Sequence, residues 1–212
     1  MKASPIEEVR DMYEASADSY AAMMDSEIDL PIYKDTLGRL STNIADTPGA
    51  LIDTSCGSGH MLSMYRECYD RERALVGIDL SPRMVSIAST RLGAAADVVL
   101  GDMRDLDMVD AGKAAAVMSF FSIHHLDARG VRCALREWHR VTRASGQLLL
   151  AAWEGVGTID YGDVSDVVAF RYANPELNAW IQEAGFAITR NVVEPVEGMT
   201  MDAIVLEGTR VG

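Results

Sequence analysis

From residue 50 onward, the chain alternates short apolar runs with longer amphipathic segments. The apolar runs, which we expect to be strands, cover residues 50–53, 74–79, 97–101, 114–121 and 147–153. The amphipathic segments between them, which we expect to be helices, cover residues 60–69, 81–92 and 128–142. Strands that are apolar along their whole length, alternating with amphipathic helices, are typical of a parallel sheet covered on both faces. The pattern therefore predicts an α/β, doubly wound fold.

The residues before this alternation are predicted to be helical. Ser4 and Pro5, with an acid soon after them, are typical of a helix start and predict a short helix that ends near Tyr13. A second short helix is expected at 17–24. A longer one is expected at 30–44, because its apolar residues recur at spacings of three and four.

The rhythm changes again after residue 153. A connection rich in Gly and Asp covers residues 154–166, and long connections of this kind are often lids or binding segments. A helix is expected from Asn174 to about Gly185, followed by strands at 186–193 and 201–207. Only a short turn separates these last two strands, so we expect them to pair antiparallel.

We expect a single domain over residues 1–212, because the length of 212 residues and the hydrophobic content of 49% suit one substantial core. Residues 1–45 would form a helical cap and residues 46–153 a cofactor-binding core. Residues 154–212 would hold a lid segment, the last helix and the final two strands. The seven expected strands would form a mostly parallel sheet with an antiparallel last strand.

Charge and cysteine content argue against several classes of protein. The net charge of -13 and the pI near 4.6 disfavour a nucleic-acid partner, because binding a phosphate backbone needs clustered Lys and Arg. The sequence has neither a membrane-spanning stretch nor a signal-peptide pattern, so we expect a cytoplasmic protein without membrane association. The three cysteines lack metal-ligand spacing, and we expect neither a metal site nor a disulfide. A homodimer is compatible with this composition.

Polar and small residues follow the expected strands, and the carboxyl ends of parallel strands meet at one edge of a sheet, where ligands bind. The first strand ends at Asp53 and enters a loop of small residues that lets a ligand approach the backbone closely. The second and third strands end at Asp79 and Asp102. A carboxylate at residue 53 repels a pyrophosphate and suits a cationic ligand such as an ammonium group. The sequence therefore predicts a cofactor site that prefers a cation.

These motifs resemble those of the class I S-adenosylmethionine-dependent methyltransferases of the small-molecule type. The residues that carry the resemblance are the stretch 51–59, Gly77-Ile78-Asp79-Leu80-Ser81, Gly101-Asp102-Met103, Ile123-His124-His125-Leu126 and Trp138-His139-Arg140-Val141. The resemblance implies a Rossmann-like fold, S-adenosyl-L-methionine as the cofactor and a small-molecule methyl acceptor. Ser55 departs from the family pattern, because the first glycine of the loop is usual there.

The resemblance also implies roles for single residues. Asp79 would accept the two ribose hydroxyls, and Asp102 would accept the adenine amino group beside Met103. Tyr13 and Tyr20 resemble paired tyrosines that close over the cofactor. The other expected cofactor contacts are Asp53, Ser55, Cys56, Gly57, Ser58, Gly59, Leu80, Met84, Gly101, Ser119 and Phe120.

The expected reaction is methyl transfer to an oxygen or nitrogen of a small molecule. A base helps only where the acceptor is protonated, and His125, with His124 second, is the candidate. The expected acceptor pocket is formed by Tyr161, Phe170, Arg171 and Tyr172. One alternative is an NAD(P)-dependent oxidoreductase, which Leu62 disfavours because the dinucleotide fingerprint has Gly at that position. A second alternative is a cofactor-binding protein without catalysis.

Overall fold

The computed structural model describes residues 2–162 and 165–212, and its main sheet has seven strands. These are β1 (Ala50–Asp53), β2 (Leu75–Asp79), β3 (Asp97–Leu100), β4 (Ala114–Phe120), β5 (Thr142–Trp153), β8 (Phe186–Pro195) and β9 (Asp202–Arg210). The α-helices are α1 (Ile6–Glu27), α2 (Pro31–Asn43), α3 (His60–Cys68), α4 (Pro82–Leu92), α5 (Ala128–Val141) and α6 (Asn174–Glu183). Short 3-10 helices, η1 (Gly93–Ala95) and η2 (Ile123–His125), follow α4 and β4.

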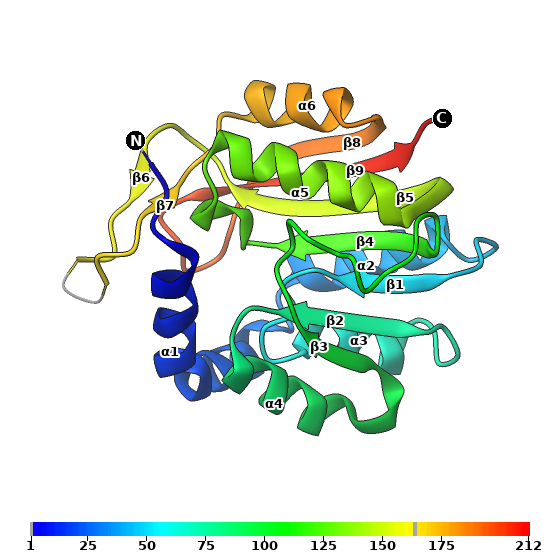
Figure 1. Ribbon diagram of the computed structural model, residues 1–212, viewed down its shortest axis with the longest axis horizontal. Helices are drawn as coiled ribbons and strands as arrows, with labels where there is room; N and C mark the ends of the chain where they lie inside the picture. Colours follow the sequence, from blue (N-terminus) through cyan, green and yellow to red (C-terminus); the bar gives the residue numbers. More distant parts are fainter. Residues whose placement is uncertain (1, 163–164) are drawn as a thin grey trace.

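The strands are ordered β3-β2-β1-β4-β5-β9-β8 across the sheet (Figure 1). Strands β1 to β5 are parallel, and β9 runs antiparallel to both β5 and β8. The doubly wound α/β fold with an antiparallel last strand is therefore confirmed. The strand order reverses between β1 and β4, which is where open sheets of this kind bind ligands.

Two apolar cores lie on opposite faces of the sheet. On one face α2, α3 and α4 pack against the strands, with Leu37, Leu62 and Ala88 all fully buried. On the other face α5 and α6 contribute Trp138 and Trp180 to a second core. Both faces of the parallel strands are thus covered, which explains why these strands are apolar along their whole length.

The first helix corrects the prediction of two short helices at 4–13 and 17–24. Helix α1 is one continuous element, because no Gly or Pro interrupts residues 6–27. Ser4 does not cap it. Instead, the Ser4 Oγ accepts a hydrogen bond from the Val168 backbone N–H at 3.0 Å. The long helix stands at the carboxyl edge of the parallel strands (Figure 1).

The tail differs from the sequence prediction in detail. The connection after β5 holds a small antiparallel pair, β6 (Thr158–Ile159) and β7 (Ala169–Phe170), which two-residue strands are too short to reveal by pattern. Strand β5 begins at Thr142, directly after α5. A register shift opposite Ala114 and a positive φ of 62° at Ser145 mark a bulge before its regular part.

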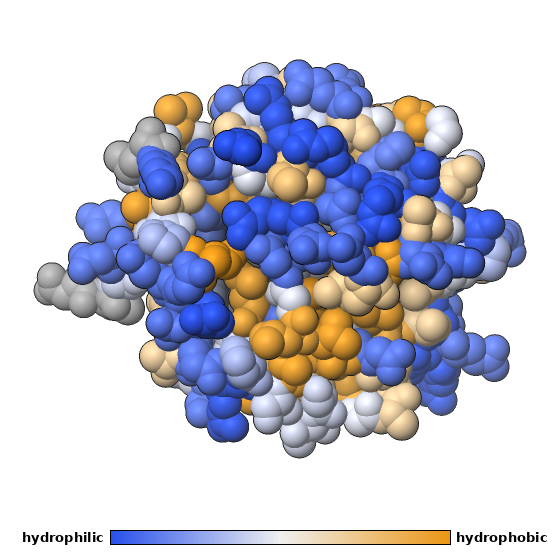
Figure 2. Space-filling view, viewed as in Figure 1, coloured by the Kyte–Doolittle hydropathy of each residue, from blue (hydrophilic) through white to orange (hydrophobic). Residues whose placement is uncertain are grey.

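Strand β3 is an edge strand whose outer end is poorly covered. Leu100 is 55% exposed and Met108 51% exposed. Figure 2 shows an apolar patch over this part of the sheet. None of the helices in the described part of the chain combines the length and the apolar character that a membrane span requires.

Candidate functional site

A cavity of about 470 Å³ lies at the carboxyl edge of the sheet, under the N-terminal segment and α1. This volume lies within the usual range for small-molecule sites. The predicted cofactor and catalytic residues that line it are Tyr13, Tyr20, Ser55, Gly57, Asp79, Leu80, Met84, Asp102, Met103, Phe120 and His125. The structure thus brings residues from α1 and from the ends of β1, β2, β3 and β4 to one cavity.

The loop after β1 shows why a serine is tolerated at position 55. Gly57 has a φ of 51° and Gly59 a φ of 82°, both in the region that favours glycine, whereas Ser55 is not among the residues with positive φ. The glycine that Ser55 replaces is therefore not needed for backbone conformation. A Cβ at Gly57 would also lie 3.2 Å from the Tyr20 ring, so α1 presses closely on this loop.

The Asp79 carboxylate is fixed at the mouth of the cavity by backbone donors. The Gly57 N–H donates to Oδ2 at 2.8 Å, and the Ser81 N–H donates to Oδ1 at 3.0 Å. Burial raises the pKa of Asp79, although these bonds oppose the shift. The side chain is thereby held rigidly between the β1 loop and the start of α4, with acceptor capacity left for a ligand.

Asp53 lies behind the loop rather than in the cavity wall. It is 3% exposed, and its Oδ1 accepts the Ser55 N–H at 3.2 Å. Burial raises the pKa of Asp53 to about 7, and the nearby Asp79 carboxylate adds to the shift. Ser55, Ser119 and Ser122 form a hydroxyl cluster beside it, with Oγ atoms 2.7 Å apart in the two closest pairs.

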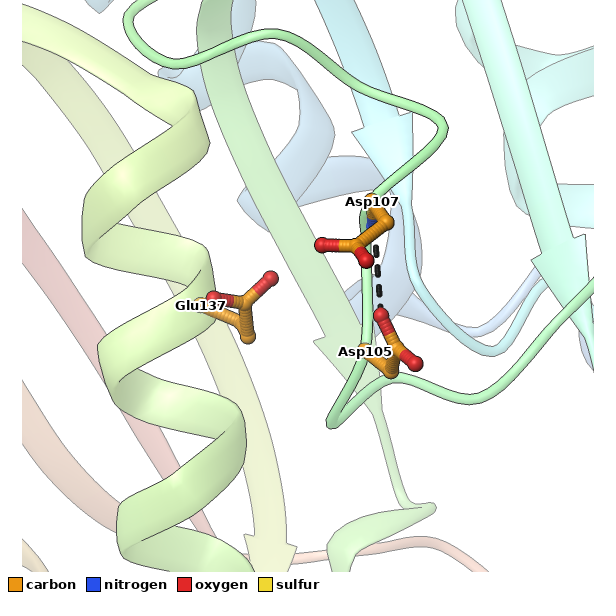
Figure 3. Close-up of side chains that lie close together, drawn as sticks. All are labelled: Asp105, Asp107 and Glu137. Carbon is orange, nitrogen blue, oxygen red and sulfur yellow. Dashed lines mark hydrogen bonds between the residues drawn. The ribbon is translucent and has the colours of Figure 1, made fainter.

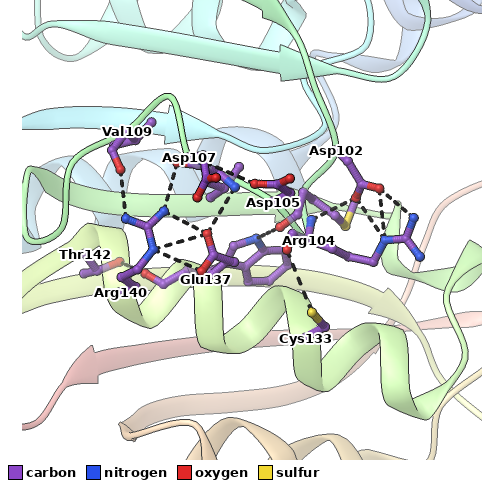
Figure 4. Close-up of polar contacts among 12 residues, drawn as sticks. Asp102, Arg104, Asp105, Asp107, Val109, Cys133, Glu137, Arg140 and Thr142 are labelled. Carbon is purple, nitrogen blue, oxygen red and sulfur yellow. Dashed lines mark hydrogen bonds and ion pairs between the residues drawn. The ribbon is translucent and has the colours of Figure 1, made fainter.

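Asp102 is held by a neighbour that the sequence did not suggest. The Arg104 guanidinium donates to both carboxylate oxygens, at 2.6 Å for the closest pair, and the Arg104 backbone N–H donates as well (Figure 4). Further along the same loop, the Leu106 N–H donates to Glu137 of α5, which also pairs with Arg140 (Figure 4). Asp102 therefore presents an orientation that is set before any ligand binds.

Three carboxylates of this region lie close together but do not form part of the cavity. The carboxylate oxygens of Asp105, Asp107 and Glu137 lie within 4.8 Å of one another (Figure 3). Arg140 already neutralises Glu137 at 2.8 Å, and the first two acids are exposed. In this cluster Glu137 holds the loop after β3 to α5 through the Leu106 N–H, and the two exposed acids face solvent.

His125 is buried at the end of η2 and is bonded to α1. Its Nε2 lies 2.9 Å from the Tyr13 hydroxyl, and the two rings meet edge to face. Burial lowers the pKa of His125 to about 4 and raises that of Tyr13. At neutral pH both groups are therefore uncharged, and one hydrogen bond joins the Tyr13 hydroxyl to the imidazole Nε2.

Acidic residues fix α1 over the cavity by bonding to α3 and α4. Glu14 accepts the Ser81 Oγ–H at 2.6 Å and the Arg83 N–H at 2.8 Å. About three turns further along, Asp25 lies 2.7 Å from the His60 Nε2. The acids lie on the side of α1 that faces these helices, so the helix closes the cavity through specific contacts.

Six predicted cofactor residues stand behind the cavity wall. These are Asp53, Cys56, Ser58, Gly59, Gly101 and Ser119. Ser58 bonds to the His60 ring at 2.8 Å, and Gly59 caps α3 against Ala88. Asp53, Cys56 and Ser58 line a narrow neighbouring cavity of about 40 Å³ together with Tyr20 and Phe120.

Some lining residues were missed by sequence reasoning. They are Val9, Thr54, Arg104, Leu126, Asp127, Gly130 and the N-terminal segment from Lys2 to Ile6. Position next to a strand end could have suggested Thr54 and Arg104. The N-terminal segment carries no local signal, because only its tertiary position brings it to the cavity.

A second cavity of about 850 Å³ lies on another side of α1, and it tests the expected acceptor residues. Tyr161 and the second catalytic candidate, His124, line it. Tyr172 does not, because it is 4% exposed in the core and its hydroxyl donates to the Ile123 carbonyl at 2.9 Å. The Arg171 guanidinium bonds to the Val156 carbonyl, and Phe170 packs against the α5 and α6 core. Of the four residues expected to form the acceptor pocket, only Tyr161 lines this second cavity.

The protein is a doubly wound α/β domain with an antiparallel last strand. Its cavity lies at the switch point of the sheet, beside the acid that ends β2, which is where open sheets of this kind bind ligands. Residues 51–146 match a family model described as a methyltransferase domain. This match covers just under half of the chain, and it confirms the resemblance to methyltransferases noted in the sequence.

One curated relative is a malonyl-[acyl-carrier protein] O-methyltransferase of Serratia marcescens, 32% identical over 113 residues. The match covers 53% of this chain and 42% of that protein, so the chain matches less than half the length of this relative.

Solved structures share the fold over nearly the whole chain. One is the Burkholderia thailandensis 1,6-didemethyltoxoflavin-N1-methyltransferase with bound 1,6-didemethyltoxoflavin and S-adenosylhomocysteine, with a TM-score of 0.76 and 16% identity. The match covers 100% of this chain and 93% of that protein. Another is the magnesium protoporphyrin IX methyltransferase of Synechocystis PCC 6803 with bound S-adenosylhomocysteine, with a TM-score of 0.74 and 16% identity. The match covers 97% of this chain and 99% of that protein.

Proposed function

We propose that this chain transfers a methyl group from S-adenosylmethionine to an oxygen or nitrogen of a small molecule. The observation that carries the proposal is Asp79, a carboxylate fixed by the Gly57 and Ser81 N–H groups at the mouth of a cavity that Tyr13 and Tyr20 cover. The methyltransferase-domain match over residues 51–146, which include Gly57, Asp79 and Ser81, supports it.

The residues around the cavity suit this cofactor. Asp79 can accept both ribose hydroxyls, and Asp102, oriented by Arg104, can accept the amino group of the adenine ring. The close approach of Gly57 to Tyr20 leaves a narrow, aromatic roof for the sulfonium end. When bound, S-adenosylmethionine supplies a methyl group on a positively charged sulfur that is already a good leaving group.

His125 contributes a neutral, hydrogen-bonding ring to the wall of this cavity. With a pKa of about 4 the imidazole is neutral at physiological pH, so the ring can orient a methyl-acceptor group by hydrogen bonding. Tyr13 holds it from α1 at 2.9 Å. In this proposal α1 is the cap of the domain, and aligning the two reactants while excluding water supplies most of the rate.

Titration calorimetry with S-adenosylhomocysteine, S-adenosylmethionine and NAD tests the proposal. Binding of both S-adenosyl compounds with weak or absent NAD binding is expected, because Leu62 is fully buried where a dinucleotide site needs glycine. Binding of NAD alone would favour an oxidoreductase. Transfer of labelled methyl groups to a pool of small molecules distinguishes an enzyme from a cofactor-binding protein without catalysis.

A further inference from the structure

The second cavity has a distinctive lining, which none of the matched motifs describes. Its walls are apolar and aromatic, with Met12, Met24, Tyr33, Trp153 and Tyr161 among them. Methionine side chains adapt to ligands of different outline, and aromatic rings favour flat ones. The volume of about 850 Å³ is large enough for a ligand of several fused rings.

This cavity, which we call the acceptor chamber, adjoins the cofactor cavity through a shared wall. Tyr13, Tyr20 and Phe121 line both. Phe121 has a φ of 45°, which is rare for a bulky residue, and its ring stacks on Trp153 with centroids 4.3 Å apart. The strained backbone thus places a flat aromatic surface at the point where the two cavities meet.

The charges around the acceptor chamber are all of one sign. Glu8, Asp11, Glu27 and Asp166 line it, and no Lys or Arg occurs among the described residues of its lining. The chain as a whole carries a net charge of -13. Asp11 is paired with Arg10 at 3.3 Å, whereas no ion pair is found for Glu8, Glu27 or Asp166 among the described residues. An anionic ligand would therefore meet net repulsion here, whereas a cation would be attracted by the carboxylates and by the aromatic faces.

His124 is a polar residue of this lining whose hydrogen bonds are unmade. It is 4% exposed, and neither ring nitrogen has a partner within the described protein. Burial keeps its pKa well below the usual value, so the ring stays neutral and offers one N–H donor and one acceptor nitrogen. Buried polar groups without partners are rare in folded proteins, and a bound ligand can supply one.

We propose that the acceptor chamber selects a flat aromatic methyl acceptor that is uncharged or positively charged, and that His124 hydrogen-bonds a polar substituent on its ring. The proposal rests on the proposed function, because it assigns the acceptor of that same reaction. His124 acts here as a positioning residue for the acceptor.

Three probes with one ring system and different charge test the selection: 5-hydroxytryptamine, which is cationic, 5-hydroxyindole, which is neutral, and 5-hydroxyindole-3-acetate, which is anionic. Their dissociation constants are measured by calorimetry at low ionic strength with S-adenosylhomocysteine saturating. We expect the anion to bind at least about tenfold more weakly than the cation, with the neutral probe between them. Equal affinities, tighter binding of the anion or no binding of any probe would overturn the proposal.

The titration with S-adenosylhomocysteine alone separates this proposal from the proposed function. If that titration shows no binding, both fail together. If S-adenosylhomocysteine binds and the probes do not follow the expected order, only the acceptor class is wrong. A Glu27→Gln, Asp11→Asn variant should weaken the cationic probe about threefold or more and leave S-adenosylhomocysteine affinity unchanged. The control Asp29→Asn, an exposed acid paired with Lys34 outside the chamber, should change neither.

A second pair of probes tests His124. The native chain should bind 5-hydroxytryptamine about fivefold or more tightly than tryptamine, because the hydroxyl gains a partner. His124→Phe should abolish this preference while S-adenosylhomocysteine affinity stays the same, and His124→Asn should restore part of it. A preference that survives in His124→Phe would show that the hydroxyl is bound by another group.

Discussion

Asp53 offers a quantitative test of how the loop after β1 is built. Its carboxyl group is 3% exposed, with one hydrogen bond from the Ser55 N–H and no cationic partner recorded among the described residues. Burial raises its pKa from 3.8 to about 7. The group therefore ionises far more easily in the unfolded chain than in the folded protein.

The direction of the pH effect follows from this difference. Because the pKa is raised on folding, the contribution of Asp53 to stability is fully present below about pH 4. It is lost as the pH rises through about 7. With about 1.36 kcal/mol for each unit, the shift corresponds to about 4 kcal/mol across the whole window. The Asp53→Asn variant has no such titration, so its stability should be flatter with pH.

The assay is urea unfolding of the native chain and of Asp53→Asn, without cofactor, from about pH 5 to about pH 8. We expect the native chain to lose about 2–3 kcal/mol relative to the variant over this range. Other titrating groups cancel in the difference between the two proteins. Parallel pH profiles would show that Asp53 is ionised and solvated in the folded state, and would refute the account of the loop.

Three further substitutions probe the cofactor cavity. Asp79→Asn should weaken S-adenosylhomocysteine binding about 10- to 150-fold in calorimetry, because one charge-assisted hydrogen bond is lost. An affinity within twofold of native would contradict the ribose role of Asp79. Gly57→Ala should lower the free energy of unfolding by about 1–2 kcal/mol, because the φ of 51° disfavours a side chain and the new Cβ meets the Tyr20 ring; an unchanged melting temperature would argue against this loop conformation. Tyr13→Phe should cost about 1 kcal/mol of stability and slow methyl transfer more than it weakens cofactor binding, because His125 loses its partner; equal turnover in the variant would separate the bond from function.

The order of elements was predictable because local pattern and tertiary environment agree. The parallel strands are buried on both faces, so each appears in the sequence as a continuous apolar run. Ser81 and Pro82 mark the start of α4 by local chemistry alone, and the Ser81 Oγ does accept the Met84 N–H at 3.1 Å. Residues at strand ends, such as Asp79 and Asp102, reach the cavity for the same topological reason.

Features that depend on distant contacts were not predictable in this way. The position of α1 over the cavity depends on contacts of Glu14 and Asp25 with helices far along the chain, although its continuity had a local sign in the absence of Gly and Pro from residues 6–27. Arg171 and Tyr172 follow a loop that looked like a binding segment. Their partners, the Val156 and Ile123 carbonyls, turn them away from the cavities. The acceptor chamber joins α1 to segments beyond residue 120, and no local pattern shows that meeting.

A crystal structure of the chain with S-adenosylhomocysteine tests the central claim most directly. The account predicts that the product fills the cavity at the carboxyl edge, with its ribose hydroxyls on Asp79 and its sulfur facing the shared wall of Tyr13, Tyr20 and Phe121. A product bound elsewhere, or in this cavity with its ribose away from Asp79, would contradict the account.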